Sequence, residues 1–372
     1  MNRCPACGTI YADDARFCTK DGTKLMPKPG APTPPVGAPV VPPPAVAADP
    51  YSALTPSRGT QAGRAEPPKP VTHTSLVDRT LDGRYQIQKK IGEGGMSFVY
   101  LALDVATKEK YAIKVLSAAL SRDQNAMARL KREASLGMRL AHPNVCHIIR
   151  LGETQDGLVY VVMPYVQGEI LSDRNNRKGM LPLDEVVRFV NHIAAGLHVA
   201  HELKIVHRDL KPENVMICPA PEGGERAVVM DFGLAKERRA DAELQKLTAT
   251  GIILGTPEFM SPEQLRGKPL DPRTDVYSLS LMTYEMLTGK LPFTGRTQQE
   301  MMIARLRSEP TPIRQARPEL NISEGVEKVL IKGMSRDPDD RYTTAPEFAA
   351  ALASAASGGA VEGGLLGRLF GR

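Results

Sequence analysis

The chain has 372 residues, of which 42% are hydrophobic and 24% charged, so it can hold one large globular domain or two smaller ones with flexible ends. Its net charge of +6 comes from scattered Lys and Arg residues, without tryptophan or a basic stripe interleaved with aromatic residues, which argues against a nucleic-acid partner. The longest apolar run, 158–166, is interrupted by a proline and is too short to span a bilayer. We therefore expect no membrane span and a cytoplasmic protein.

Three of the five cysteines lie in the first 18 residues, at Cys4, Cys7 and Cys18. A Cys-x-x-Cys pair followed by glycine is typical of a zinc knuckle, although Asp21 stands where a fourth cysteine is expected. So few apolar residues accompany them that folding would need the metal. We predict a zinc-ribbon-like module over 1–26, with these four residues as zinc ligands and a structural or partner-binding role. A decayed ribbon without metal and a redox cysteine pair remain as alternatives.

Two segments have the composition of flexible chain. Residues 27–80 are rich in proline and alanine and predict a disordered linker, because such a segment buries too little surface to offset its ordering entropy. A proline-rich ligand for another domain is the alternative there. Residues 353–372 predict a flexible tail, with a short amphipathic docking segment as the alternative.

The region between these segments is globular and predicts an α+β fold. Strands are expected first and helices afterwards, so that a small β-rich lobe over about 84–166 precedes a large helical lobe over about 167–352. The expected strands are 84–87, 98–103, 111–115 and 158–163, with a hairpin at 215–217 and 227–230, and the expected helices are 123–140, 186–197 and 275–287.

Residues 207–214 concentrate polar chemistry in one short stretch. They follow the apolar pair Ile205-Val206, which predicts a short strand running into a polar loop. Asp209 could accept a proton from a hydroxyl, Lys211 could neutralise a phosphate, and Asn214 could hold a metal ion, which together suit phosphoryl transfer. The alternative is an ordinary solvated loop.

Three further features fit the same chemistry. The glycine-rich stretch 92–99 between two predicted strands lets backbone amides approach phosphates, although many such stretches are only hairpin turns. Lys114 lies inside an apolar strand, where an ammonium needs anionic partners, and Glu133 on the next helix and nucleotide phosphates are the candidates. Asp231 follows another strand and could bind magnesium, with a plain turn as the alternative.

Taken in order, these motifs resemble the protein kinase domain of the Hanks type, particularly that of bacterial serine/threonine kinases. The resemblance covers the glycine loop, the strand lysine, the helix glutamate, 207–209, Asn214, 231–233 and 261–263. It implies a two-lobed kinase fold over 81–352. Ser97 replaces a usual loop glycine, Pro164 a usual hinge acid and Ser280 another usual glycine, but no catalytic group is missing.

The resemblance also implies roles for individual residues. Asp209 is the expected catalytic base with Lys211 and Asn214 beside it, Asn214 and Asp231 are the expected ligands of Mg or Mn, and Lys114 tied to Glu133 is expected to position the ATP phosphates. Glu263 is expected to pair with Arg341. The remaining expected ATP contacts are Ile91, Gly92, Glu93, Gly94, Gly95, Met96, Ser97, Phe98, Val99, Ala112, the gatekeeper Met163, the Pro164 carbonyl and the Val166 amide.

Control by phosphorylation is expected as well. Arg208 beside the base would receive a phosphothreonine, with Lys236 as a second receiver, and Thr248 and Thr250 are the expected autophosphorylation sites, modified through a transient dimer. Lys211 together with 255–256 favours serine/threonine acceptors on protein substrates. Two alternatives are a zinc-ribbon scaffold with a nucleotide-binding but weakly active kinase-like domain, and a small-molecule kinase.

Overall fold

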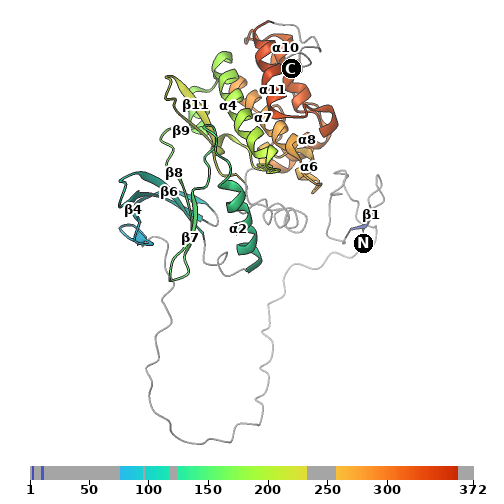
Figure 1. Cartoon of the computed structure of the whole chain (residues 1–372). Helices are drawn as coiled ribbons and strands as arrows, with labels where there is room; N and C mark the ends of the chain where they lie inside the picture. The colour runs from blue at the N-terminus through green and yellow to red at the C-terminus, as the bar shows by residue number, and fades with distance from the viewer. Residues whose placement is uncertain are drawn as a thin grey trace, which may run out of the picture.

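The structure is a computed structural model that describes residues 2–3, 10–11, 76–94, 97–116, 124–232 and 257–358 (Figure 1). In the predicted zinc module it describes only the pairing of β1 (Asn2–Arg3) with β2 (Ile10–Tyr11). The four predicted zinc ligands, the linker up to residue 75 and the tail from residue 359 lie outside the described residues. The predictions made for them stay predictions.

The N-terminal lobe is an antiparallel sheet with the strand order β3-β4-β5-β6-β8-β7. Each expected strand of this lobe is present. Their bounds are β3 (Thr80–Leu81), β4 (Tyr85–Gly94), β5 (Ser97–Asp104), β6 (Lys110–Leu116), β7 (Arg150–Glu153) and β8 (Val159–Pro164).

The lobe begins earlier than its composition indicates. Leu76 is fully buried among Leu81, Ile87 and other core residues of the sheet, and Thr80 pairs with Gln86 in the β3–β4 ladder. The prediction of a disordered linker over 27–80 is therefore wrong for 76–80. A single buried leucine and a two-residue strand carry no period that sequence reasoning could detect.

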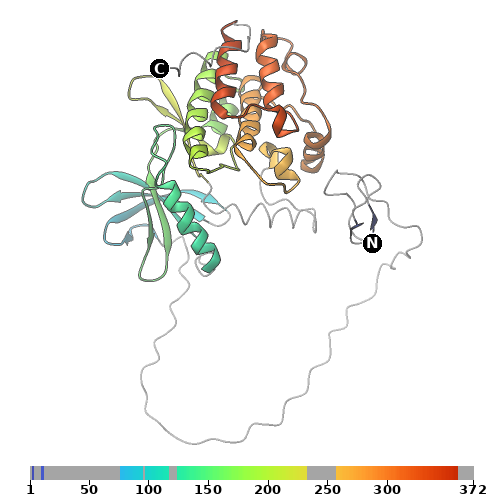
Figure 2. The same cartoon turned by 45° about the vertical axis from the view of Figure 1, so that its right-hand side comes forward.

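Helix α2 (Gln124–Gly137) lies beside the sheet, as both views show (Figures 1 and 2). Leu130 and Ala134 are buried, and the predicted apolar face of this helix is confirmed. The helix ends at Gly137, three residues before the predicted end. A Cβ at Gly137 would approach the end of the Ile148 side chain to 2.7 Å, so a larger residue here would require Ile148 to shift.

The C-terminal lobe is mostly helical, as expected, and carries a small sheet with the order β11-β10-β9. The predicted hairpin is β10 (Val215–Pro219) with β11 (Glu225–Val229), joined by β9 (Glu169–Ile170). The helices are α3 (Leu171–Lys178), α4 (Leu183–Glu202), α6 (Pro262–Leu265), α7 (Pro272–Thr288), α8 (Gln298–Arg307), α9 (Ile313–Ala316), α10 (Glu324–Gly333) and α11 (Ala345–Ala356), with short 3-10 turns at Pro212–Asn214, Pro257–Phe259 and Pro338–Asp340.

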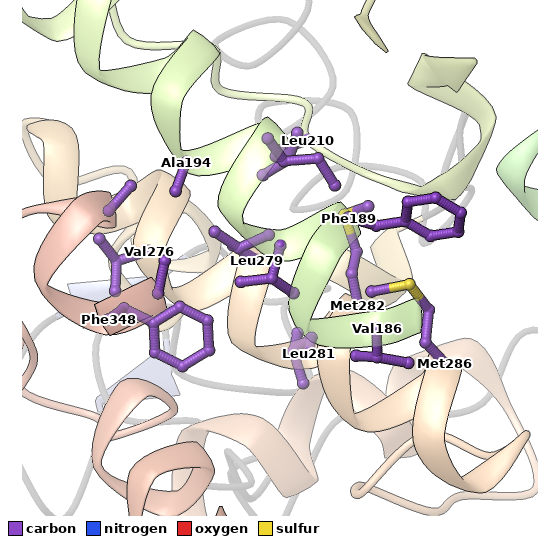
Figure 3. Packing of buried hydrophobic residues seen from close by; sticks show 14 of the residues in the cluster. Val186, Phe189, Ala194, Leu210, Val276, Leu279, Leu281, Met282, Met286 and Phe348 are labelled. Carbon is purple, nitrogen blue, oxygen red and sulfur yellow. The ribbon is translucent and has the colours of Figure 1, made fainter. Parts of the chain in front are cut away.

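Helix α7 forms the centre of this lobe. Its residues are buried on nearly every side, which is why its sequence shows little amphipathic pattern. Val186 and Phe189 of α4 lie near Met282 and Met286 of α7, and Phe348 of α11 lies in the same cluster (Figure 3). The helical domain ends at Ala356, beyond the predicted boundary at 352.

The stretch that leads into the polar loop is not a strand. Ile205 and Val206 are part of an extended connection after α4, and the strand predicted for them is wrong. Leu210, which is almost fully buried, anchors the loop instead by inserting into the core near α4 and α7 (Figure 3). Burial of this side chain therefore helps to hold a loop that is mostly polar.

Candidate catalytic site

The backbone of the polar loop is held by Asp275, a fully buried residue of α7. One carboxylate oxygen accepts hydrogen bonds from the His207 N–H at 2.8 Å and from His201 Nε2 at 2.8 Å, and the other accepts from the Arg208 N–H at 3.0 Å. Sequence reasoning missed this role. The available signal was an acidic residue at the start of an otherwise apolar helix.

His207 connects the same loop to the segment after β11. Its Nε2 donates to the Met230 carbonyl at 2.8 Å, and its ring meets that of Phe232 edge to face at 4.8 Å between centroids. The two predicted motifs around Asp209 and Asp231 are thus held against each other by a buried imidazole.

Asp209, Lys211 and Asn214 come together as predicted. Asn214 Nδ2 donates to the Asp209 carbonyl at 2.7 Å and to its carboxylate at 2.8 Å, while Lys211 Nζ lies 3.7 Å from the same carboxylate. One amide thus binds both the backbone and the side chain of Asp209, which favours one orientation of the carboxylate, with an ammonium beside it. This is a carboxylate positioned to accept a proton, next to a cation able to compensate phosphate charge.

The donor set also fits a magnesium ion. Because Asn214 Nδ2 is used by Asp209, the amide oxygen is the atom left for a cation, and hard cations prefer oxygen ligands. The Asn214 carbonyl accepts from the Met230 N–H at 2.8 Å, which places Asn214 next to the residue preceding Asp231. Asn214 and Asp231 are therefore adjacent oxygen donors that could hold the metal.

Lys114 reaches across from the N-terminal lobe to Asp231. Its Nζ lies 2.8 Å from Asp231 Oδ1, and the two side chains are 13% and 37% exposed. Partial burial opposes ionisation of Asp231, but the Lys114 charge and hydrogen bond outweigh it and lower the pKa of the carboxyl. The side chain of Glu133, the predicted partner, lies outside the described residues, so that pairing stays a prediction.

An apolar cluster joins the two lobes around this ion pair. The predicted adenine contacts Val99, Ala112, Met163 and Val166 all belong to it. Met216 and Met230 also belong to it, and sequence reasoning missed them because they come from the other lobe. The cluster offers the apolar surface that a purine base needs.

Cys146 is a buried member of this cluster and contacts the predicted hinge. Its thiol lies 3.7 Å from the Pro164 carbonyl, which was expected to receive adenine. Burial, aided by Asp231 and opposed by Lys114, raises the pKa of Cys146 to about 12. The thiol is therefore neutral near the Lys114–Asp231 ion pair.

The glycine-rich stretch is a β-hairpin between β4 and β5. Gly92 pairs with Val99, Glu93 with Phe98 and Gly94 with Ser97, and the register shifts between Lys90 and Gly92. Ile91, an expected ATP contact, is 41% exposed. Gly95 and Met96 at the tip lie outside the described residues, as do Lys236, Thr248, Thr250 and 255–256.

A buried ion pair braces the region around α6, as predicted. Arg341 donates two hydrogen bonds of 2.8 Å to the Glu263 carboxylate, which also accepts from Thr274 at 2.9 Å. Burial opposes ionisation of Glu263, but the hydrogen bonds and charge of Arg341 outweigh it and lower the pKa of the carboxyl. Helix α6 is thereby fixed to the start of α7.

We expect Arg341→Met to lower the free energy of unfolding by about 3 kcal/mol, because it leaves the buried Glu263 charge without its cation. Urea denaturation measures this difference, and Glu263→Met combined with Arg341→Met should recover part of the loss. The control is Arg336→Met, which breaks an exposed pair with Glu309 and should cost less than about 1 kcal/mol. Equal losses in the two single variants would contradict this expectation.

Glu285 of α7 is a largely buried carboxyl near two other glutamates, Glu213 and Glu258. Burial, together with the charges of Glu213 and Glu258 and against a 3.3 Å hydrogen bond from Asn175, raises its pKa to about 7. For an acid with a raised folded-state pKa, the folded state binds the extra proton, so stability is full below about pH 4.5 and falls as pH rises towards about 7.

Glu285→Gln should therefore stabilise the protein more at pH 8 than at pH 5. The glutamine keeps an acceptor for Asn175 and removes the charge. The difference between about 7 and the ordinary 4.5 corresponds to an upper limit of about 3.5 kcal/mol, at about 1.4 kcal/mol per pKa unit. Thermal melting across this pH range tests it, with Glu202→Gln at the exposed end of α4 as the control. A gain that is larger at pH 5 would contradict the assignment.

The two lobes and this site define the class of protein. A six-stranded lobe and a helical lobe meet at a lysine–aspartate pair, an oriented carboxylate and adjacent oxygen donors, which is a phosphoryl-transfer arrangement. The protein kinase domain model matches residues 85–353. The chain therefore belongs to the protein kinase family.

Known relatives agree with this assignment. The chain is 37% identical over 276 residues to the serine/threonine-protein kinase pkn3 of Myxococcus xanthus, an alignment that covers 74% of this chain and 50% of that protein. It is 34% identical over 280 residues to PrkC of Bacillus subtilis, covering 75% and 42% of the two chains. The crystal structure of the PknI kinase domain from Mycobacterium tuberculosis is similar with a TM-score of 0.58 at 27% identity, covering 75% of this chain and 98% of that one.

The chain spans about half or less of these curated relatives, so the similarity concerns their kinase domains. Over the residues that the structure describes, no helix is both long and apolar enough to cross a bilayer.

Proposed function

We propose that this protein is a serine/threonine protein kinase that transfers the γ-phosphate of ATP to hydroxyls of protein substrates. The observation that carries the proposal is the Asp209 carboxylate, which accepts a hydrogen bond from Asn214 Nδ2 and lies beside Lys211. The serine/threonine-protein kinases to which the chain is similar support the choice of acceptor.

The residues of this chain supply positioning and charge. Asp209 orients the substrate hydroxyl and accepts its proton, and Lys211 compensates negative charge on the transferring group. Lys114 binds the phosphates of the nucleotide, which rest under the β4–β5 hairpin, while the apolar cluster around Met163 receives the base. Magnesium, held by Asn214 and Asp231, would neutralise phosphate charge when bound.

The direct test incubates the purified protein with labelled ATP and a generic basic protein and maps the phosphorylated residues by mass spectrometry. We expect label on serine and threonine of the added protein. Absence of transfer despite nucleotide binding would instead favour the alternative, a scaffold with a weakly active kinase-like domain. Label on a small metabolite but on no protein would favour a small-molecule kinase.

We propose that activity is raised by autophosphorylation of Thr248 and Thr250 in a transient dimer, with Arg208 and Lys236 receiving the phosphate. A phosphothreonine carries about −1.5 to −2 charges and pairs well with arginine. Combined Thr248→Ala and Thr250→Ala should remove phosphate from this segment and lower activity about tenfold or more. Full activity in that variant, with no phosphate on these residues in the wild type, would refute the idea.

We also propose that residues 1–26 bind zinc through Cys4, Cys7, Cys18 and Asp21 and dock a partner protein. The support is the ligand spacing in the sequence. Metal analysis of the full-length protein should find about one zinc per chain, and Cys4→Ser combined with Cys7→Ser should remove it. A zinc-to-protein ratio near zero in the wild type would refute the proposal.

A further inference from the structure

The peptide that carries Asp209 has an uncommon backbone conformation. Arg208 has φ +65°, in the left-handed region that residues other than glycine rarely adopt. A residue strained in this way persists only where its surroundings hold it. Its N–H is held by Asp275 at 3.0 Å, and its carbonyl accepts a hydrogen bond from Gln264 Nε2 at 2.6 Å.

Gln264 is itself held in one orientation. Its side chain is buried at the start of α6, where Oε1 accepts from the Ser261 N–H at 2.9 Å and Ser261 Oγ accepts from the Gln264 N–H at 3.3 Å. This is a capping box, which either glutamine or glutamate can close. Because Ser261 uses the oxygen of the carboxamide, the NH₂ group faces the Arg208 carbonyl.

Helix α6, which carries Gln264, is held in place by a buried ion pair. The neighbouring Glu263 is bound by Arg341 and Thr274, so α6 cannot shift without breaking a buried ion pair. Both backbone polar groups of Arg208 are thus hydrogen-bonded: Asp275 of α7 binds its N–H, and Gln264 of α6 binds its carbonyl. The carbonyl of Arg208 and the nitrogen of Asp209 share one planar peptide group.

We propose that Gln264 is a positioning residue for phosphoryl transfer: it holds the Arg208 carbonyl and so sets the direction in which the Asp209 carboxylate points. The inference rests on the kinase activity proposed above. The proposal gives α6 a part in the reaction. The hydrogen bond from Gln264 to Arg208 connects α6, which follows Thr248 and Thr250 in the chain, to the catalytic loop. Gln264 acts through Asp209 and needs no contact with substrate.

The discriminating variant is Gln264→Glu in the full-length protein. The carboxylate can still accept from the Ser261 N–H and close the capping box, but it places an acceptor against the Arg208 carbonyl in place of a donor. We expect kcat to fall about tenfold or more, while KM for ATP changes less than about twofold. Because the introduced carboxylate is buried, Tm should fall at about pH 8 and recover towards the wild-type value at about pH 6. Glu347→Gln makes the reverse change at the exposed start of α11, where Glu347 accepts from the Thr343 N–H, and should leave kcat unchanged.

A pH profile separates positioning from general damage. At about pH 6 a larger share of the introduced carboxyl is protonated and can donate to the Arg208 carbonyl, so the activity of Gln264→Glu relative to wild type should rise as pH falls from about 8 to about 6. A second readout needs no turnover. Amide hydrogen exchange in residues 205–210 should be faster in Gln264→Glu than in wild type.

Equal kcat in the two proteins, a pH-independent loss of activity, or unchanged exchange in 205–210 would each overturn the proposal. Failure of the wild type to transfer label would refute the proposed function instead, and the exchange experiment would still decide the role of Gln264.

Discussion

Asp209→Asn should lower phosphate transfer about 10³-fold or more while leaving nucleotide affinity within about threefold of the wild type. The substitution is nearly isosteric, and its side-chain oxygen can still accept the hydrogen bond from Asn214. What it removes is the carboxylate that accepts the substrate proton and the charge that Lys211 faces. A 10³-fold loss corresponds to about 4 kcal/mol of transition-state stabilisation.

The measurement compares label transfer with the binding of a fluorescent ATP analogue in the same preparations. Asp173→Asn, an exposed aspartate in the first turn of α3, is the matched control and should behave as wild type. If Asp209→Asn retained more than about a tenth of the activity, or lost nucleotide binding in parallel, its assignment as the base would be wrong.

The second large effect is expected at the ion pair between the lobes. Asp231→Asn should lower transfer about 10³-fold and remove the magnesium dependence of nucleotide binding, because it deletes a carboxylate ligand of the metal and the partner of Lys114. In the wild type, magnesium should raise the thermal stabilisation given by ADP, and EDTA should reverse this gain. In the variant, magnesium and EDTA should give the same melting temperature.

Asp156→Asn provides the control for loss of an ion pair as such. Asp156, in the turn between β7 and β8, accepts from Arg79 at 2.7 Å in a largely exposed pair. Its replacement should change neither turnover nor the magnesium effect. A magnesium effect that survived in Asp231→Asn would move the metal site elsewhere.

The local pattern of apolar residues was enough to predict most helices and strands of the fold. Short apolar runs located the strands β5, β6 and β8. The 3-and-4 spacing of Val186, Phe189, Ile193 and Leu197 located α4. The misses have a common cause. Leu76 and the connection at 205–206 are decided by burial against distant residues, which a short window of sequence does not contain.

The residues of the candidate site likewise fall into those that the sequence predicted and those that only the structure revealed. Asp209, Lys211, Asn214 and Asp231 carry chemical groups that phosphoryl transfer needs, so their types and order were sufficient to predict them. Asp275 and Gln264 carry ordinary polar groups. The local signal for Asp275 was only its place at the start of an apolar helix, and Gln264 looks like an ordinary helix cap. Their roles arise from hydrogen bonds that span 56 to 74 positions of the chain.

The sequence by itself therefore determined the catalytic groups and the order of the two lobes, because both depend on residue type and local period. Only the tertiary structure decided what orients those groups: Asp275 and Gln264 on the two sides of Arg208, Asp231 opposite Lys114, and methionines of the helical lobe facing the sheet. The physical reason is that a side chain acquires a direction from its partners, and here those partners come from elements that only folding brings together.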